Sequence, residues 1–161
     1  MNITSILIAS WVATAPCFAS ESAIIGEWKS NGEKTINYLT EHTKLTDQQQ
    51  RSFKEIFGKN VIIFKPDGTG TMVMPPSTIS LIDGKELKLE GRTIEFTYEI
   101  LGETTTQIVM KSHSENSVIL KNRPFSLITL HGRDSYSVSL DDGITELYGR
   151  EFFDRIEPSE E

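Results

Sequence analysis

The candidates for acid–base or metal chemistry in this chain are the three histidines and, among its 23 acidic residues, the pair Glu95 and Glu99. Glu95 and Glu99 share one face of an alternating segment, where four residues of strand separate them by ~13 Å. Paired carboxylates that hydrolyse glycosides lie ~5 to 9.5 Å apart. Because the apolar residues of the segment occupy its other face, we expect Glu95 and Glu99 to be solvated surface side chains.

The histidines do not follow a metal-binding spacing. His42, His113 and His131 are scattered, and no two of them stand at the i, i+4 spacing that places two imidazoles on one ion. We expect His131 to be a solvated turn residue, with a lone ligand or acid at the rim of the fold as the alternative. Asp141-Asp142-Gly143 is too short for a calcium loop, and we find no nucleophile elbow or phosphate loop. We therefore predict no metal, no cofactor, no catalytic residue and no enzymatic activity.

The first residues have the features of a secretory signal. The apolar run at residues 6–13 is followed by small residues around Ala19, whereas a membrane span needs ~20 apolar residues. We predict cleavage after Ala19, so that residues 1–19 are the signal and residues 20–161 form one mature domain, periplasmic or secreted. A lipoprotein that uses Cys17 as lipid acceptor is the alternative, although Pro16 is a poor context for it.

The composition of the mature part excludes several kinds of site. Cys17 is the only cysteine, so the mature chain has no disulfides, thiol nucleophiles or cysteine-based zinc sites. The formal net charge is −7, and an acidic surface repels phosphate backbones and anionic membranes. We expect no nucleic-acid partner and no membrane span.

Two short helices are predicted before the first long run of strands. Ser30-Asn31-Gly32-Glu33 has the form of a capping box and predicts a helix from Glu33 to about Thr43. A second box begins at Thr46 and ends at Gln49, and Gly58 then stops the second helix. Each apolar edge is too narrow to form a core alone, so both helices must rest on something apolar.

From Asn60 onward the hydrophobic period changes from helical to alternating. Three Asp-Gly pairs lie between alternating runs, and Asp-Gly suits the positive φ of tight hairpin turns. We expect about nine or ten further short strands in an antiparallel meander, a number typical of a sandwich or closed barrel. They are expected near residues 61–64, 71–74, 79–81, 87–89, 94–100, 107–111, 117–121, 125–130, 135–140 and 145–156.

The two ends of the mature chain carry a family resemblance. The strand opening Ile24–Ser30 contains Gly26-x-Trp28, and Arg155 lies in the last predicted strand. With this pair the chain resembles bacterial lipocalin-like barrels of the calycin type, in which a first-strand Trp is covered by an Arg from the end of the barrel. The resemblance implies a mostly β, up-and-down antiparallel barrel. The alternative is that Trp28 is an ordinary core residue and Arg155 a solvated charge.

The predicted helices are where the chain departs from this family. Lipocalins have a long loop after the first strand, which folds across the open mouth of the barrel. If that topology holds, Phe53 and Phe57 belong to a lid over the mouth. The alternative is that the helices pack outside the sheet.

Three functions are compatible with the sequence. The first is binding of a small apolar or amphipathic ligand in a cavity lined by the inward residues Ile62, Phe64, Phe96, Tyr98 and Ile100. The second is a protein-binding module, such as an inhibitor or an envelope-assembly factor, with a filled barrel. An enzyme that uses a cavity carboxylate or histidine is third, and fold analogy alone does not decide among them.

Overall fold

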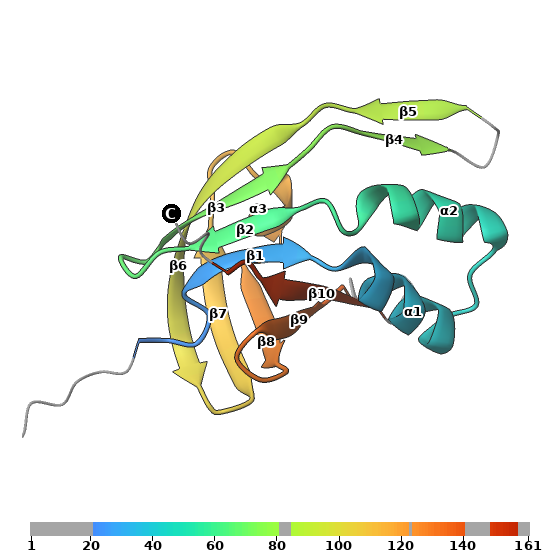
Figure 1. Cartoon of the computed structure of the whole chain (residues 1–161). Coiled ribbons are helices and arrows are strands. Elements are labelled where there is room, and N and C mark those ends of the chain that lie inside the picture. The colour runs from blue at the N-terminus through green and yellow to red at the C-terminus, as the bar shows by residue number, and fades with distance from the viewer. Residues whose placement is uncertain (1–20, 81–84, 123, 141–148, 158–161) are drawn as a thin grey trace, which may run out of the picture.

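A closed β-barrel forms the centre of the structure (Figure 1). The computed structural model describes residues 21–80, 85–122, 124–140 and 149–157. Eight antiparallel strands close in the order β1-β10-β9-β8-β7-β6-β3-β2. Their bounds are Gly26–Ser30 (β1), Val61–Phe64 (β2), Thr69–Met74 (β3), Arg92–Glu103 (β6), Gln107–His113 (β7), Phe125–Leu130 (β8), Ser135–Ser139 (β9) and Arg150–Arg155 (β10). The predicted up-and-down antiparallel barrel is confirmed. The expected signal at residues 1–19 and the turns at 83–84 and 142–143 lie outside the described residues.

Two helices and a hairpin are added to the barrel (Figure 1). Helices α1 (Gly32–His42) and α2 (Asp47–Ile56) follow the first strand, as predicted. α1 packs on β10, and α2 packs on α1 and on the hairpin. The hairpin consists of β4 (Ser77–Ser80) and β5 (Glu86–Leu89) and forms a separate small sheet.

The helix starts depend on side-chain caps. Thr46 and Gln49 form the predicted capping box of α2, each accepting a hydrogen bond from the other's backbone N–H. The cap of α1 is Asn31 rather than Ser30, because Asn31 Oδ1 accepts from the backbone N–H of Lys34 at 2.9 Å. Ser30 is the last residue of β1 instead, and its hydroxyl donates a hydrogen bond to Glu151 inside the barrel.

One predicted strand is wrong. Residues 117–121 were expected to be a strand, but the structure has helix α3 (Val118–Asn122) there. The hydroxyl of Ser117 accepts a hydrogen bond from the backbone N–H of Leu120 at 3.3 Å, and the N–H of Lys121 donates to the Ser117 carbonyl at 3.0 Å. This capped turn satisfies backbone groups that a strand would have paired with a neighbour.

The antiparallel order gives the barrel two unlike ends. We call the base the end where β1 begins and β10 ends, together with the turns at residues 65–68, 104–106 and 131–134. We call the mouth the opposite end, where α1, α2, the β4–β5 hairpin and α3 join the strands.

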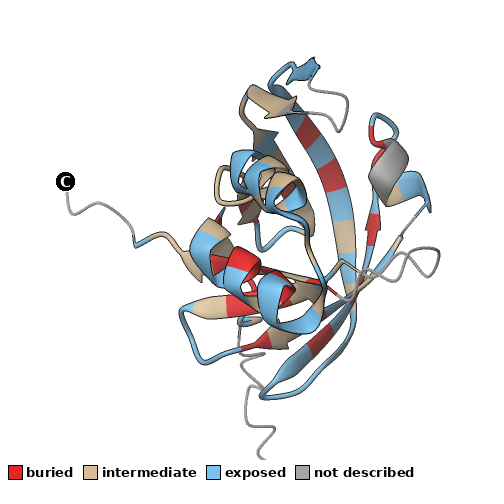
Figure 2. Ribbon diagram, turned by 90° about the vertical axis from the view of Figure 1, so that its right-hand side faces the viewer, coloured by how far each residue is buried: buried red, intermediate tan, exposed pale blue. Residues whose placement is uncertain are grey.

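The inward rows of side chains form the core. Buried and exposed residues alternate along the longest barrel strand (Figure 2), because successive side chains of a strand point to opposite faces. The most deeply buried large side chains, each no more than 2% exposed, are Ile24, Trp28, Leu39, Ile108, Ile128, Tyr136 and Phe153.

Candidate functional site

A cavity of about 500 Å³ lies inside the barrel and extends to α3 at the mouth. Strands β2, β3 and β6 to β9 supply its walls, since their inward rows face one another across the barrel. Its apolar lining residues are Ile62, Phe64, Met72, Phe96, Met110, Leu120, Pro124, Phe125, Leu127, Ile128, Val138 and Leu140. Its polar lining residues are Ser112, Asn122, Ser126, Tyr136 and Ser139.

The lining carries no formal charge. None of the described residues around the cavity is Asp, Glu, Lys, Arg or His. A charged group of a ligand would lose its hydration here without gaining an ionic partner, which is costly. The cavity is therefore suited to uncharged, mainly apolar molecules.

Three of the predicted ligand-lining residues lie in this cavity. Ile62, Phe64 and Phe96 are buried and line its wall. The rings of Phe64 and Phe96 meet edge to face with centroids 5.8 Å apart. Gly70 on β3 makes this possible, because a side chain at that position would collide with the Phe96 ring.

The other predicted strand residues, Tyr98 and Ile100, do not line the cavity. The Tyr98 hydroxyl donates to the carbonyl of Lys65 in the β2–β3 turn at the base. Burial raises the pKa of Tyr98 most, and the negative charges of Asp67 and Glu21 raise it further. Ile100 is half-buried and packs against the core.

The two helix phenylalanines also lie outside the cavity lining. Phe53 and Phe57 are half-buried, and their ring centroids are 5.7 Å apart. Helix α2 rests on α1 and β4 rather than on the strands that line the cavity. The structure thus does not bring Phe53 or Phe57 to this cavity.

The cavity also reaches the side of the barrel, where β8 and β9 separate. These strands pair only at residues 128–130 and 136–138, so residues 125–127 of β8 pair with β7 alone. Phe125 and Leu127 are 61% and 46% exposed and still border the cavity at this gap. Apolar side chains therefore continue from the cavity onto the outer surface.

Tyr136 separates the cavity from the packed base. It is 1% exposed, and its ring stacks on Phe153 with centroids 4.9 Å apart and meets Trp28 edge-on at 4.8 Å. Its hydroxyl is buried and has no hydrogen-bond partner among the described residues. Burial, together with the charge of Glu151, raises the pKa of Tyr136 well above its ordinary value, so the phenol stays protonated.

Glu151 is a second buried polar group of the barrel interior. Its Oε1 accepts a hydrogen bond from the Ser30 hydroxyl at 2.7 Å and from Asn60 Nδ2 at 3.4 Å. The backbone N–H of Gly58 donates to the same Ser30 hydroxyl at 2.9 Å, which ties the end of α2 to β1 and β10. Burial raises the pKa of Glu151, although the two hydrogen bonds to it act in the opposite direction.

Sequence reasoning missed both Tyr136 and Glu151. The alternation in β10 is ambiguous because each of its faces carries one aromatic residue, Phe152 outside and Phe153 inside. For Glu151 the sequence did hold a signal. Glu151, Phe153 and Arg155 are each two residues apart and therefore share one face of the strand. If Arg155 faces Trp28, Glu151 lies on the same inner face.

The base of the barrel is closed by Trp28 and Arg155, which are register partners on β1 and β10. The guanidinium carbon of Arg155 lies 4.1 Å from the centroid of the Trp28 ring. Arg155 also donates to the carbonyls of Ile25 at 2.8 Å and Ala23 at 2.7 Å. Gly26, with φ of 133°, leaves room for this side chain, because a Cβ there would collide with the guanidinium. The Gly26-x-Trp28 pattern thus has a steric reason.

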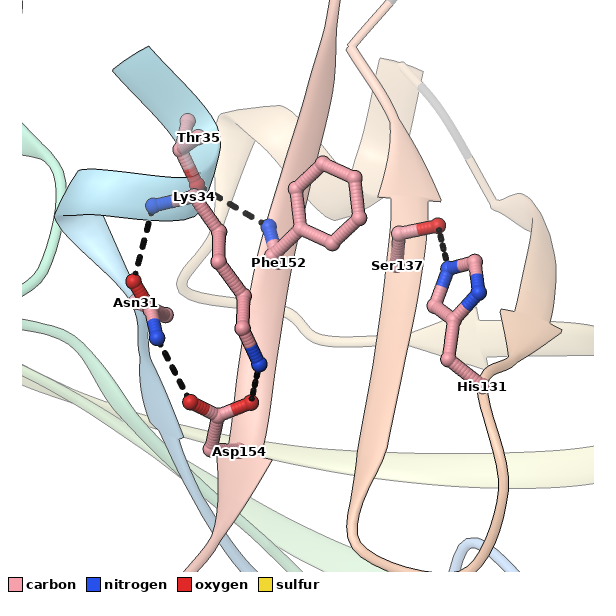
Figure 3. Close-up of polar contacts among 7 residues, drawn as sticks. All are labelled: Asn31, Lys34, Thr35, His131, Ser137, Phe152 and Asp154. Atoms are coloured by element: carbon pink, nitrogen blue, oxygen red, sulfur yellow. Dashed lines mark hydrogen bonds and ion pairs between the residues drawn. The ribbon is translucent and has the colours of Figure 1, made fainter. Parts of the chain in front are cut away.

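A polar cluster joins α1 to the outer face of β10 (Figure 3). Lys34 Nζ lies 2.7 Å from Asp154 Oδ1, and Asn31 Nδ2 donates to Asp154 Oδ2 at 2.6 Å. The Thr35 hydroxyl accepts from the backbone N–H of Phe152 at 3.0 Å. Burial opposes ionisation of Asp154, but the hydrogen bonds from Lys34 and Asn31 contribute to a net lowering of its pKa. This cluster attaches the helix to the barrel.

His131 and Ser137 form a pair on the same outer face (Figure 3). His131 Nε2 and Ser137 Oγ are hydrogen-bonded at 2.8 Å, and the His131 ring stacks on Phe152 with centroids 5.5 Å apart. Such a pair is a nucleophile and base when substrate can reach the hydroxyl, but Ser137 is 0% exposed. Burial, followed by the positive charge of Arg150, lowers the pKa of His131. His131 is exposed in the turn between β8 and β9, as expected, and it also packs on Phe152.

The remaining candidate groups stay apart. In the described part of the chain, no three His, Cys, Asp or Glu side chains gather as metal ligands. Glu95 and Glu99 are exposed on β6. None of the described helices has the length and apolar character needed to cross a bilayer.

Comparison with known proteins adds no family assignment. No protein-family model matches the chain, and no curated protein matches its sequence. The barrel, its cavity and the buried groups around it are therefore the features that bear on function.

Proposed function

We propose that this chain is an exported, lipocalin-like protein that binds a small apolar or amphipathic molecule inside its barrel without transforming it. The observation that carries the proposal is the charge-free, mainly apolar cavity of about 500 Å³. Ligand pockets typically measure about 300–1,000 Å³ and combine apolar walls with a few polar groups. Ser112, Ser126 and Tyr136 are such groups here.

Two further observations support the lipocalin likeness and the export. The closed antiparallel barrel with Arg155 over Trp28 has the arrangement that the family resemblance implies. The sequence of residues 1–19 supports a periplasmic or secreted location, because its apolar run is short and ends in small residues.

The test is uptake of the apolar dye N-phenyl-1-naphthylamine by the purified mature protein. The variant Ser126→Phe places a ring in the cavity, because Ser126 lines it beside Met110, its register partner on β7. We expect this variant to bind the dye at least about tenfold more weakly, since the added ring fills space that the dye needs. The matched control is Val109→Phe, which places the same ring on the outer face of β7, where Val109 is 41% exposed.

A protein-binding module is the second candidate, and the outer surface supports it. Leu101, Val109, Leu127 and Phe125 are exposed apolar residues on β6, β7 and β8, and Val109 and Leu127 are register partners. This alternative predicts that Ser126→Phe does not change dye binding. Equal dye binding by Ser126→Phe and the parent would show that the dye does not bind in the cavity and would contradict the proposal.

A further inference from the structure

Tyr136 lines the cavity, and its buried hydroxyl, which has no partner among the described residues, carries an inference about the chemistry of the ligand. The rings of Phe153 and Trp28 pack against the Tyr136 ring. These aromatic contacts hold the ring, whereas its hydroxyl lacks a partner among the described residues. A buried hydroxyl without a partner destabilises the fold, and a ligand atom that accepts or donates a hydrogen bond would remove that penalty.

Resting on the proposed function, we infer that the cavity takes an uncharged amphiphile whose single hydrogen-bonding oxygen meets the Tyr136 hydroxyl and whose apolar body extends toward α3. Fatty alcohols, ketones and esters belong to this class. Phe64, Met72, Phe96 and Ile128 line the space that the apolar body would occupy.

The charges around Tyr136 select against an ionised head group. No cationic side chain lines the cavity among the described residues, so a carboxylate would have no ionic partner there. Glu151 lies close enough to Tyr136 for its charge to act on the phenol. An anionic head group at Tyr136 would face that carboxyl as well.

A cationic head group fits less well than a neutral one. The described hydrogen bonds to Glu151 are accepted by its Oε1, from Ser30 and Asn60, and Glu151 is not one of the residues that line the cavity. An amine would have to lose its hydration to enter an apolar space.

The test compares four probes of similar length that displace N-phenyl-1-naphthylamine: 1-decanol, decanoate, decylamine and nonane. At about pH 8 decanoate and decylamine are ionised. We expect 1-decanol to displace the dye at concentrations at least about tenfold lower than decanoate or decylamine. Equal displacement by decanoate, or tighter binding of decylamine, would overturn the inference.

The variant Tyr136→Phe isolates the hydroxyl. We expect it to weaken 1-decanol about three- to tenfold, the effect of one hydrogen bond, and to leave nonane unchanged. Its melting temperature should stay equal or rise, because the substitution removes a polar atom that has no partner among the described residues.

The matched control is Tyr98→Phe. The Tyr98 hydroxyl has a structural partner, the Lys65 carbonyl, and Tyr98 does not line the cavity. We expect Tyr98→Phe to lower the melting temperature and to leave 1-decanol binding unchanged. If Tyr136→Phe behaves like Tyr98→Phe, the Tyr136 hydroxyl is structural and the inference is wrong.

The two proposals fail in different ways. If the dye does not bind the parent protein, or binds Ser126→Phe as well as the parent, the proposed function fails. If the dye binds the cavity but all four probes displace it alike, only the inference about the head group fails.

Discussion

The base of the barrel and its cavity are built from the same strands but are packed differently. At the base, Trp28 is 0% exposed, its indole N–H donates to the Ile24 carbonyl at 2.7 Å, and Arg155 covers its ring. Toward the mouth, the inward rows leave about 500 Å³ between them. The packed base can supply much of the stability, so the cavity region does not have to be filled for the barrel to fold.

Two carboxylates on β10 show the same contrast across one strand. Glu151 points into the barrel, where burial raises its pKa, and Asp154 points to the outer face, where hydrogen bonds lower its pKa. The residues are three positions apart, so the alternation of the strand places them on opposite faces. The side of the sheet therefore decides whether the pKa of a carboxyl is raised or lowered.

The largest expected effect is at the base. We expect Trp28→Ala to lower the free energy of unfolding by about 3–5 kcal/mol, through lost contacts and the space left behind. Phe96→Ala should cost less, because the Phe96 ring already borders the cavity and loses fewer contacts. Urea denaturation of both variants measures the difference. Equal costs would show that the cavity wall is as tightly packed as the base.

The next effect concerns closure of the base by Arg155. We expect Arg155→Met to lower the free energy of unfolding by about 1–2 kcal/mol, since it removes the cation–π contact and the hydrogen bonds to the Ile25 and Ala23 carbonyls. Methionine keeps much of the apolar stem that covers the indole. Thermal melts of the parent and the variant give the measurement, and an unchanged melting temperature would mean that Trp28 needs no cover.

The smallest expected effect compares the two carboxylates of β10 as a function of pH. Because the folded pKa of Glu151 is raised, stability is lost as pH rises from its ordinary pKa through the folded pKa. Glu151→Gln should therefore be more stable than the parent near neutral pH, by on the order of 1 kcal/mol, and lose this advantage in acid.

Asp154→Asn is the control with the opposite sign. The folded pKa of Asp154 is lowered, so its contribution is present above its ordinary pKa and is lost as pH falls through the folded pKa. We expect this variant to be slightly less stable than the parent near neutral pH and equal to it in acid. Urea midpoints between about pH 3 and pH 8 follow both variants. A Glu151→Gln difference that does not change with pH would contradict the assignment.

Sequence reasoning succeeded where one local pattern had one structural solution. The Thr46–Gln49 capping box needs only backbone and side-chain groups within one turn, and it forms as predicted. It failed at residues 117–121, whose apolar residues suit a strand, because the cap at Ser117 and the packing beside β7 favour a short helix. Tyr98 and Ile100 were assigned to the cavity because they share a face with Phe96, but position along the barrel axis separates them from it.

By itself the sequence determined the mostly β class, the hairpin order and the helices after the first strand. These follow from periodicity and turn residues, which act over a few positions. The pairing of the Gly26-x-Trp28 strand with the Arg155 strand was implied only by the family resemblance, and the structure shows it. Only the tertiary structure decided which face of an ambiguous strand points inward. In β8, Ser126 and Ile128 point inward while Phe125 and Leu127 are exposed, and in β10 Glu151 is buried. Both faces of these strands carry apolar residues, so local hydrophobicity favours neither, and the register of the closed barrel selects one.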